Sequence, residues 1–186
     1  MFGIRRLRRP LRRDHARAPG QPTRLQRAGG LLVVVAALAL PVQALAGDQV
    51  PLKGWDSGSF TLEADGGCGT GVLRVVIDDA GKATHVGAYA YHANECFDPS
   101  TLAFTGTFTI TSANGDAISG TYAGLVVEVV GTLGFYEQDA VITDGTGRFA
   151  GASGGFHLSG IANLDPASLE SSQWISGTVS SPGSLK

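Results

Sequence analysis

The sequence has little of what many enzymes use for chemistry. Among its 186 residues there are two cysteines, one methionine and four histidines. It contains no H-E-x-x-H pattern and no glycine-rich loop of the phosphate-binding type, which argues against zinc proteolysis and nucleotide chemistry. No segment of the exported part described below repeats apolar residues at helical spacing over three turns. Long amphipathic helices are therefore not expected there.

Long hydrophobic runs are also absent, and the one strongly apolar stretch is LLVVVAALAL at residues 31–40. It follows thirty residues that hold nine arginines and one acid, and it precedes PVQALA. This order is typical of a secretory signal peptide, and Ala44 and Ala46 predict cleavage after Ala46. A membrane anchor is the alternative, but Pro41 and Gln43 interrupt the run well short of the roughly 20 apolar residues that a spanning helix needs.

The predicted signal peptide divides the sequence into two parts. Residues 1–46 are expected to be a signal peptide with a long basic leader, and residues 47–186 a single secreted or periplasmic domain with no membrane span. That domain keeps five basic residues against fifteen acidic ones, a net charge of −10. Such a surface repels phosphate backbones and anionic lipid, so we expect no nucleic-acid partner. The sequence predicts no particular oligomeric state.

The two cysteines, Cys68 and Cys96, both fall in the exported part. In an oxidising compartment such a pair most simply forms a disulfide. A catalytic or metal-binding thiol is the alternative, but neither cysteine has a second cysteine at ligand spacing, and His92 near Cys96 does not by itself make a site. We expect a disulfide between them and no metal or cofactor.

Strand alternation recurs along the exported part. In LAFTGTFTIT, residues 102–111, Leu102, Phe104, Phe108 and Ile110 share one face and four threonines the other, as in a half-buried strand. Strands are expected at 53–63, 72–78, 83–91, 102–111, 117–126, 128–135, 137–143, 149–163 and 173–180. Turns are expected at 79–82, 114–116 and 144–147, where glycine and aspartate or asparagine cluster. About eight antiparallel strands make an all-β barrel or sandwich.

Glycine favours the barrel. Twenty-three of the 140 residues after Ala46 are glycine, and many fall inside expected strands: Gly58, Gly87, Gly106, Gly120, Gly131, Gly151, Gly160 and Gly177. Glycine weakens a flat sheet, whereas tightly coiled strands need positions without Cβ at bends. We therefore predict a closed antiparallel β-barrel, with a β-sandwich as the alternative.

Three short stretches carry a family resemblance: DGTGRFAGASG, KATHVGAY and TSANGDAISGTYAG. The first resembles the glycine-rich turn and strand of the dirigent and allene oxide cyclase superfamily. The other two are similar to segments of small secreted bacterial proteins of the allene-oxide-cyclase-barrel type. The resemblance implies an eight-stranded antiparallel barrel with an internal cavity. Characterised relatives steer the cyclisation of a reactive hydrophobic intermediate or the radical coupling of phenols, but no functional residue can be aligned from them.

Few residues qualify as candidates for chemistry. His85 is the candidate catalytic group, against the alternative of a structural histidine at a turn. Most acidic residues fall at expected turns or strand ends, where they would solvate the backbone. The aromatic residues favour an interior pocket, with these ligand-pocket candidates: Trp55, Tyr89, Tyr122, Phe135 and Trp174.

The expected function is the binding of a small hydrophobic molecule inside the barrel. The first alternative is a cofactor-free isomerase or cyclase of the allene oxide cyclase or dirigent type, in which binding and orientation do most of the work. The second is a structural or interaction protein whose barrel is filled by its own side chains. A carboxylate or His85 at the wall of an open cavity would favour the enzyme.

Overall fold

The computed structural model describes residues 48–64 and 66–180, so the predicted signal peptide and its cleavage site lie outside the described residues. The described chain folds into eight antiparallel strands and one short 3-10 helix. The strands are β1 (Gln49–Glu63), β2 (Leu73–Ala83), β3 (Gly87–Asp98), β4 (Ala103–Ser112), β5 (Ala117–Val130), β6 (Leu133–Gly145), β7 (Gly154–Asn163) and β8 (Glu170–Ser180); the helix η1 (Gly147–Phe149) lies between β6 and β7.

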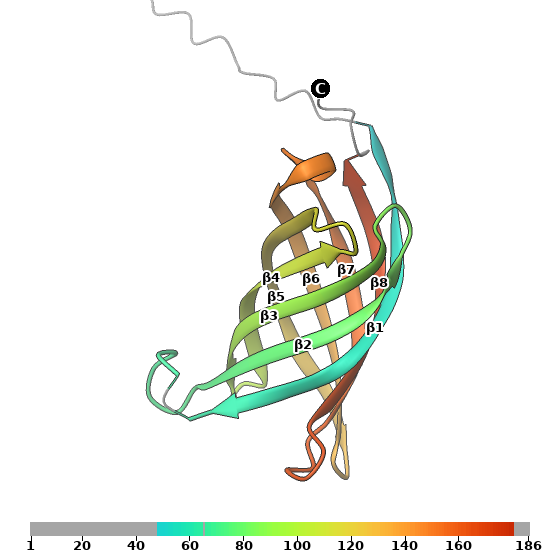
Figure 1. Cartoon of the computed structure of the whole chain (residues 1–186). Helices are drawn as coiled ribbons and strands as arrows, with labels where there is room; N and C mark the ends of the chain where they lie inside the picture. The colour runs from blue at the N-terminus through green and yellow to red at the C-terminus, as the bar shows by residue number, and fades with distance from the viewer. Residues whose placement is uncertain (1–47, 65, 181–186) are drawn as a thin grey trace, which may run out of the picture. The chain divides into compact units, whose positions relative to one another are not determined.

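The eight strands form a closed barrel in sequence order (Figure 1). Each strand pairs with the next one along the chain, and β1 and β8 close the ring from Gln49 opposite Ser180 to Ser59 opposite Glu170. The prediction of an antiparallel eight-stranded barrel is confirmed, and the sandwich alternative is wrong. Closure leaves no long unpaired strand edge.

Inward and outward residues alternate along each strand as the pleat requires. On β4, Phe104, Phe108 and Ile110 are buried, while Thr105 and Thr107 are exposed. Leu102 does not belong to this inward row. It precedes β4 in a tight turn, with a φ of 63°.

Several expected strand and turn boundaries are wrong, and two of them show why. Residues 79–82 do not form a turn, because β2 continues through them to Ala83 and the chain reverses at residues 84–86. Residues 128–135 are not one strand, because the chain reverses at Gly131, whose φ is 63°, and divides that segment between β5 and β6. At residues 79–82 an inward-facing aspartate resembles a turn residue, and at residues 128–135 a valine-rich hairpin resembles a single strand. Residue type alone therefore predicts the wrong boundary in both segments.

Several glycines that face the barrel interior make room for aromatic rings on neighbouring strands. A Cβ at Gly124 would lie 2.4 Å from the ring of Phe104, and one at Gly160 would lie 2.2 Å from the ring of Tyr136. The glycine content thus serves ring packing inside the barrel as well as the turns. Gly131 and Gly151, expected within strands, lie in turns with positive φ.

The two ends of the barrel differ. We call the end that carries η1 and the β2–β3 and β4–β5 turns the closed end, and the opposite end the open end. At the closed end Phe149 and Val86 are buried in the core, and Arg148 covers them. The Arg148 Nη2 donates to the Val86 carbonyl at 2.9 Å, and its guanidinium carbon lies 4.7 Å from the centre of the Phe149 ring.

The predicted disulfide between Cys68 and Cys96 is confirmed, with a Cα–Cα distance of 5.5 Å. It joins the glycine-rich β1–β2 loop to β3 near the open end. The described part of the chain holds no helix that is long and apolar enough to cross a membrane.

Candidate functional site

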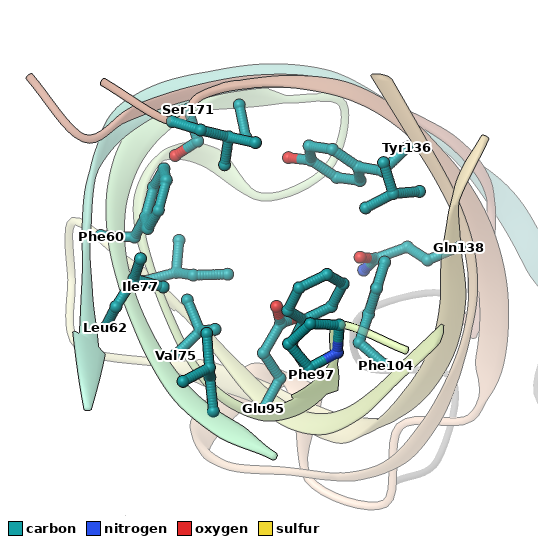
Figure 2. A pocket seen from close by; sticks show the side chains of 15 residues that line it. Phe60, Leu62, Val75, Ile77, Glu95, Phe97, Phe104, Tyr136, Gln138 and Ser171 are labelled. Carbon is teal, nitrogen blue, oxygen red and sulfur yellow. The ribbon is translucent and has the colours of Figure 1, made fainter. Parts of the chain in front are cut away.

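The open half of the barrel contains a cavity of about 270 Å³. Figure 2 shows its lining side chains pointing inward from around the ring of strands. Fifteen residues line it: Phe60, Leu62, Leu73, Val75, Ile77, Glu95, Phe97, Pro99, Phe104, Val126, Tyr136, Gln138, Ala162, Leu164 and Ser171. Eleven of these are aliphatic or phenylalanine or proline residues, and the remaining four carry polar groups. A cavity of this kind suits a small molecule with a large apolar surface.

Glu95 is the ionisable group in the cavity wall. It points inward from β3, and the Tyr122 hydroxyl donates a hydrogen bond to its Oε2 at 2.9 Å. Burial disfavours the charged carboxylate and raises the pKa of Glu95 to about 7. Near neutral pH this side chain can therefore either donate or accept a proton.

Gln138 carries an unused hydrogen-bond donor into the same cavity. The residue is 4% exposed, and its Nε2 makes no hydrogen bond of good geometry to any described residue, although the side chain also approaches the Tyr91 hydroxyl. Because an amide nitrogen carries two N–H groups, at least one donor remains for a ligand. Figure 2 shows the amide directed into the cavity. A buried donor without a partner costs free energy, on the order of 1–3 kcal/mol, unless something inside the cavity accepts from it.

Tyr136 lies beside Gln138 on β6, and its hydroxyl donates to the Gln173 Oε1 at 2.9 Å. Burial strongly raises the pKa of the Tyr136 phenol, so the hydroxyl remains a donor. The Nε2 of Gln173 makes no hydrogen bond of good geometry to any residue that the structure describes, although the side chain approaches the Asp56 carboxyl group.

A pair of carboxyl groups, those of Asp56 and Asp79, is buried inside the barrel next to Ser171. The Ser171 hydroxyl faces the cavity and donates to the Asp79 Oδ1 at 2.8 Å. Asp56, next to Asp79, accepts from the Tyr89 hydroxyl at 2.5 Å. Burial is the main cause that raises the pKa of Asp79 to about 7. The hydrogen bond from Ser171 acts in the opposite sense, and the nearby charge of Asp56 adds to the rise. Because the pKa of Asp56 is also raised by burial, the pair retains a proton at neutral pH.

The predicted pocket residues separate into two groups. Tyr89 and Tyr122 point into the barrel, where they bond the carboxylates of Asp56 and Glu95 but do not themselves line the cavity. Three others face away from the interior. Trp55 and Trp174 are 54% and 58% exposed, and Phe135 alternates on β6 with inward-facing residues. For Trp55, Trp174 and Phe135 the prediction that they shape the pocket is wrong, because strand alternation places them on the outer wall.

His85 also lies away from the cavity. It is exposed in the β2–β3 turn at the closed end, with a φ of 64°. The proposed catalytic role for His85 therefore has no support in its position, and Glu95 is the proton-transfer group that the cavity contains. His157 on β7 is also exposed, and its ring nitrogens are hydrogen-bonded to Asp139 and Glu137 on β6.

Sequence reasoning missed Asp56, Gln138 and Ser171. Strand alternation is the sequence signal that could have found them. Asp56, for example, is two residues from Gly54 and Gly58 and four residues from Leu52 and Phe60, which places it in the inward row of β1. An acidic residue in phase with an inward apolar row belongs to the interior.

Two other chemistries find little support. Gly151–Gly155 reads G-x-S-x-G, but Ser153 is exposed in a loop that leads into a strand instead of the strand-to-helix turn of a nucleophile elbow. Over residues 48–64 and 66–180, no three histidine, cysteine or acidic side chains are grouped so that they could hold a metal ion.

An eight-stranded antiparallel barrel that is filled at one end and hollow at the other defines the class: the chain has a dirigent-like barrel fold. Among solved structures it is similar to the pterocarpan synthase dirigent protein PsPTS1, with a TM-score of 0.50, 12% identity, and coverage of 72% of this chain and 96% of that one. It is also similar to the pterocarpan synthase dirigent protein GePTS1, with a TM-score of 0.49, 12% identity, and coverage of 78% and 98%.

At this identity the likeness concerns the fold alone. No protein-family model matches the chain, and no curated protein matches it in sequence. The dirigent part of the predicted resemblance is thus confirmed for fold, whereas the allene oxide cyclase part and the bacterial source stay predictions.

Proposed function

We propose that the barrel binds a small, largely apolar molecule in the cavity of its open half, and that this molecule presents an oxygen acceptor to Gln138. The observation that carries the proposal is the unpartnered Nε2 of Gln138, buried in an otherwise apolar wall. An acceptor on the ligand would satisfy that donor, whereas a purely hydrocarbon ligand would leave it unpaired.

Entry from the open end is consistent with the residues at the rim. Leu62 and Leu164 line the cavity and are also partly exposed to solvent. They extend the apolar surface outward, so an apolar molecule gains contact before it is fully enclosed.

Glu95 supports a second candidate function, that of a cofactor-free isomerase or cyclase. Its carboxyl lies at the cavity wall with a pKa near 7, and Figure 2 shows Ser171 on a different part of the wall. Glu95 would act as the acid or base while the apolar walls orient the substrate. The open cavity counts against the alternative of a structural protein with a filled barrel.

The expected site of action is outside the cytoplasm. A disulfide between Cys68 and Cys96 suits a secreted or periplasmic protein, as does the predicted signal peptide. We therefore place the binding function in the periplasm or the medium.

Binding can be tested with a matched pair of probes, 2-acetylnaphthalene and 2-ethylnaphthalene. They have nearly the same shape, but only the ketone carries a strong acceptor. The wild type should bind the ketone about tenfold more tightly, because one hydrogen bond to a buried donor contributes about 1–1.5 kcal/mol. Gln138→Leu should abolish that preference, as measured by calorimetric titration.

Phe135→Ala is the control, because this residue lies on the outer wall and should leave both affinities unchanged. Failure of both probes to bind the wild type would contradict the proposal. Equal binding of both probes would contradict the role of Gln138 while leaving the cavity as a hydrophobic site. For the second candidate, Glu95→Gln should retain binding of the ketone; loss of binding would instead make Glu95 part of ligand recognition.

A further inference from the structure

Both tryptophans of the chain lie next to each other on the outer wall. Trp55 on β1 is directly opposite Trp174 on β8 in the pairing that closes the barrel, and these two strands run side by side in Figure 1. Each side chain is more than half exposed. Their indoles contribute nothing to the barrel core, although tryptophan normally buries a large apolar area.

The surroundings of the two indoles are polar. Across the strands the register places Lys82, Trp55, Trp174, Ser159 and Glu137 in one outward row. At about 4.8 Å per strand this row extends over about 19 Å. Along the strands the outward neighbours are serines and a lysine: Ser57, Ser172, Ser176 and Lys53. We call this set of nine residues the tryptophan face.

Positive charge gathers at one side of the tryptophan face. Lys82 is opposite Trp55 and Lys53 is two residues before it, so both flank the same indole. They are two of the four basic residues at positions 48–64 and 66–180, where acidic residues predominate. Neither lysine forms an ion pair with any described residue. At the other side Glu137 accepts hydrogen bonds from Ser159 and His157.

We propose that the tryptophan face binds a polysaccharide that carries carboxylate groups. The flat apolar faces of sugar rings match exposed indoles in shape and polarity. The serine hydroxyls can exchange hydrogen bonds with sugar hydroxyls, and Lys53 and Lys82 supply the charge that complements a uronate carboxylate. The site is independent of the interior cavity, because Trp55 and Trp174 point away from it.

Two other occupants fit less well. A lipid surface favours tryptophan together with a broad apolar patch, whereas the neighbours here are serine, lysine and glutamate. A second copy of the chain needs an interface of roughly 1,200 Å² or more, and two indoles bury at most about 250 Å² each. Ile161, opposite Ser172, and Phe135, opposite Ile161, add apolar side chains on the outer wall, but both are only partly exposed.

Tryptophan fluorescence gives a direct test, because the chain has no tryptophan outside this face. The intact protein is titrated with hexamers of galacturonate, guluronate and mannuronate, and with cellohexaose as the neutral probe. At least one uronate hexamer should change the emission and bind at least tenfold more tightly than cellohexaose. Added salt should weaken that binding, because the lysines are exposed.

Variants locate the site. Trp55→Ala and Trp174→Ala should each weaken uronate binding at least tenfold in calorimetric titration, and the Lys53→Gln/Lys82→Gln variant should remove the advantage over cellohexaose. Val129→Ala is the control, because this exposed aliphatic residue lies on β5, three strands from β8 and away from both indoles. All four variants alter exposed side chains, and circular dichroism checks that the barrel is retained.

Three outcomes overturn the proposal. In the first, none of the uronate hexamers binds. In the second, binding survives the loss of both indoles. In the third, cellohexaose binds as tightly as the best uronate, which removes the role of the lysines. Vesicles of phosphatidylcholine with about one third phosphatidylglycerol test the lipid alternative. Indole-dependent binding to these vesicles, without uronate binding, would assign the face to membranes.

Discussion

The closed half and the open half of the barrel are built from the same strands, yet their inward side chains do different things. On β4, Phe108 and Ile110 pack in the closed half, while Phe104, a few residues earlier, forms part of the cavity wall. On β3, Tyr91 is fully buried in the core and Glu95 faces the cavity. Strand alternation decides which residues point inward. Whether the interior is filled depends on the size and shape of the side chains that meet there.

The largest contrast between the halves should appear when one phenylalanine is removed from each. Phe108 is buried in the closed half, with ring centres 5.2 Å from Phe156 and 6.3 Å from Tyr91. Phe108→Ala should lower the free energy of unfolding by about 3–5 kcal/mol, because it opens a cavity in a packed core. Phe97 already faces the cavity, so Phe97→Ala should cost less than about half as much. Urea denaturation followed by circular dichroism measures both, and equal losses would mean that the open half is as tightly packed as the closed half.

The pattern that identifies the fold is local, which explains why the barrel could be predicted and the residues that line its cavity could not. Alternation within residues 102–111 and the turn at residues 114–116 depend on near neighbours in the sequence. The cavity depends on which strands face one another across the barrel, as Glu95, Gln138 and Ser171 do, and no local pattern encodes that. Asp79 shows the cost of reading residue type alone: with Gly81 and Lys82 it resembles a turn, but it lies within β2.

The outer wall shows the same distinction. Trp55 and Trp174 were expected inside because large aromatic residues are usually buried. Their strand phase, opposite to that of Asp56 and Ile175, points outward. Phase was the better guide in this barrel, because an inward aspartate can be retained through hydrogen bonds such as the one from Tyr89.

A second and smaller contrast concerns pH. Glu95 and Asp79 have pKa values raised to about 7 from ordinary values of 4.5 and 3.8. The folded protein holds these protons more tightly than the unfolded chain, so the contribution of these two groups to stability is greatest below about pH 4 and is lost as the pH rises to about 7. At about 1.4 kcal/mol per pKa unit, the expected loss is on the order of 3 kcal/mol for each of the two groups, measured by urea denaturation across this range.

Glu95→Gln and Asp79→Asn should each flatten part of that slope. His157 acts in the same direction at higher pH, because its hydrogen bonds to the carboxylates of Asp139 and then Glu137 raise its pKa above 6.5. His157→Gln therefore serves as the outer-wall control: it removes a contribution that is fully present below about pH 6.5, and it changes the slope of stability against pH only above that value. A slope that survives in the Glu95→Gln/Asp79→Asn variant would show that the interior carboxyl groups are not its source.

The smallest contrast uses two glycines. A Cβ at Gly160 would meet the ring of Tyr136 at 2.2 Å, whereas one at Gly134 would have its nearest contact at 3.5 Å, with Leu164. Gly160→Ala should lower stability by about 1 kcal/mol, because the Tyr136 ring borders the cavity and can shift into it. Gly134→Ala should change stability by no more than about 0.5 kcal/mol in either direction. Thermal unfolding compares the stability of the two variants. A larger loss of stability for Gly134→Ala would mean that a Cβ has more room at Gly160 than at Gly134.

The pairing of β1 with β8 has a consequence for biogenesis. The strand that starts the domain finds its second neighbour only in the strand made last, more than one hundred residues later. A nascent chain emerging during synthesis therefore carries an unsatisfied edge on β1 until β8 has been made. Pairing β1 with β8 joins parts of the chain that are distant in sequence, so we expect it to be the slow step of folding. Any factor that prevents the unfinished chain from aggregating through this edge has to act until β8 has been made.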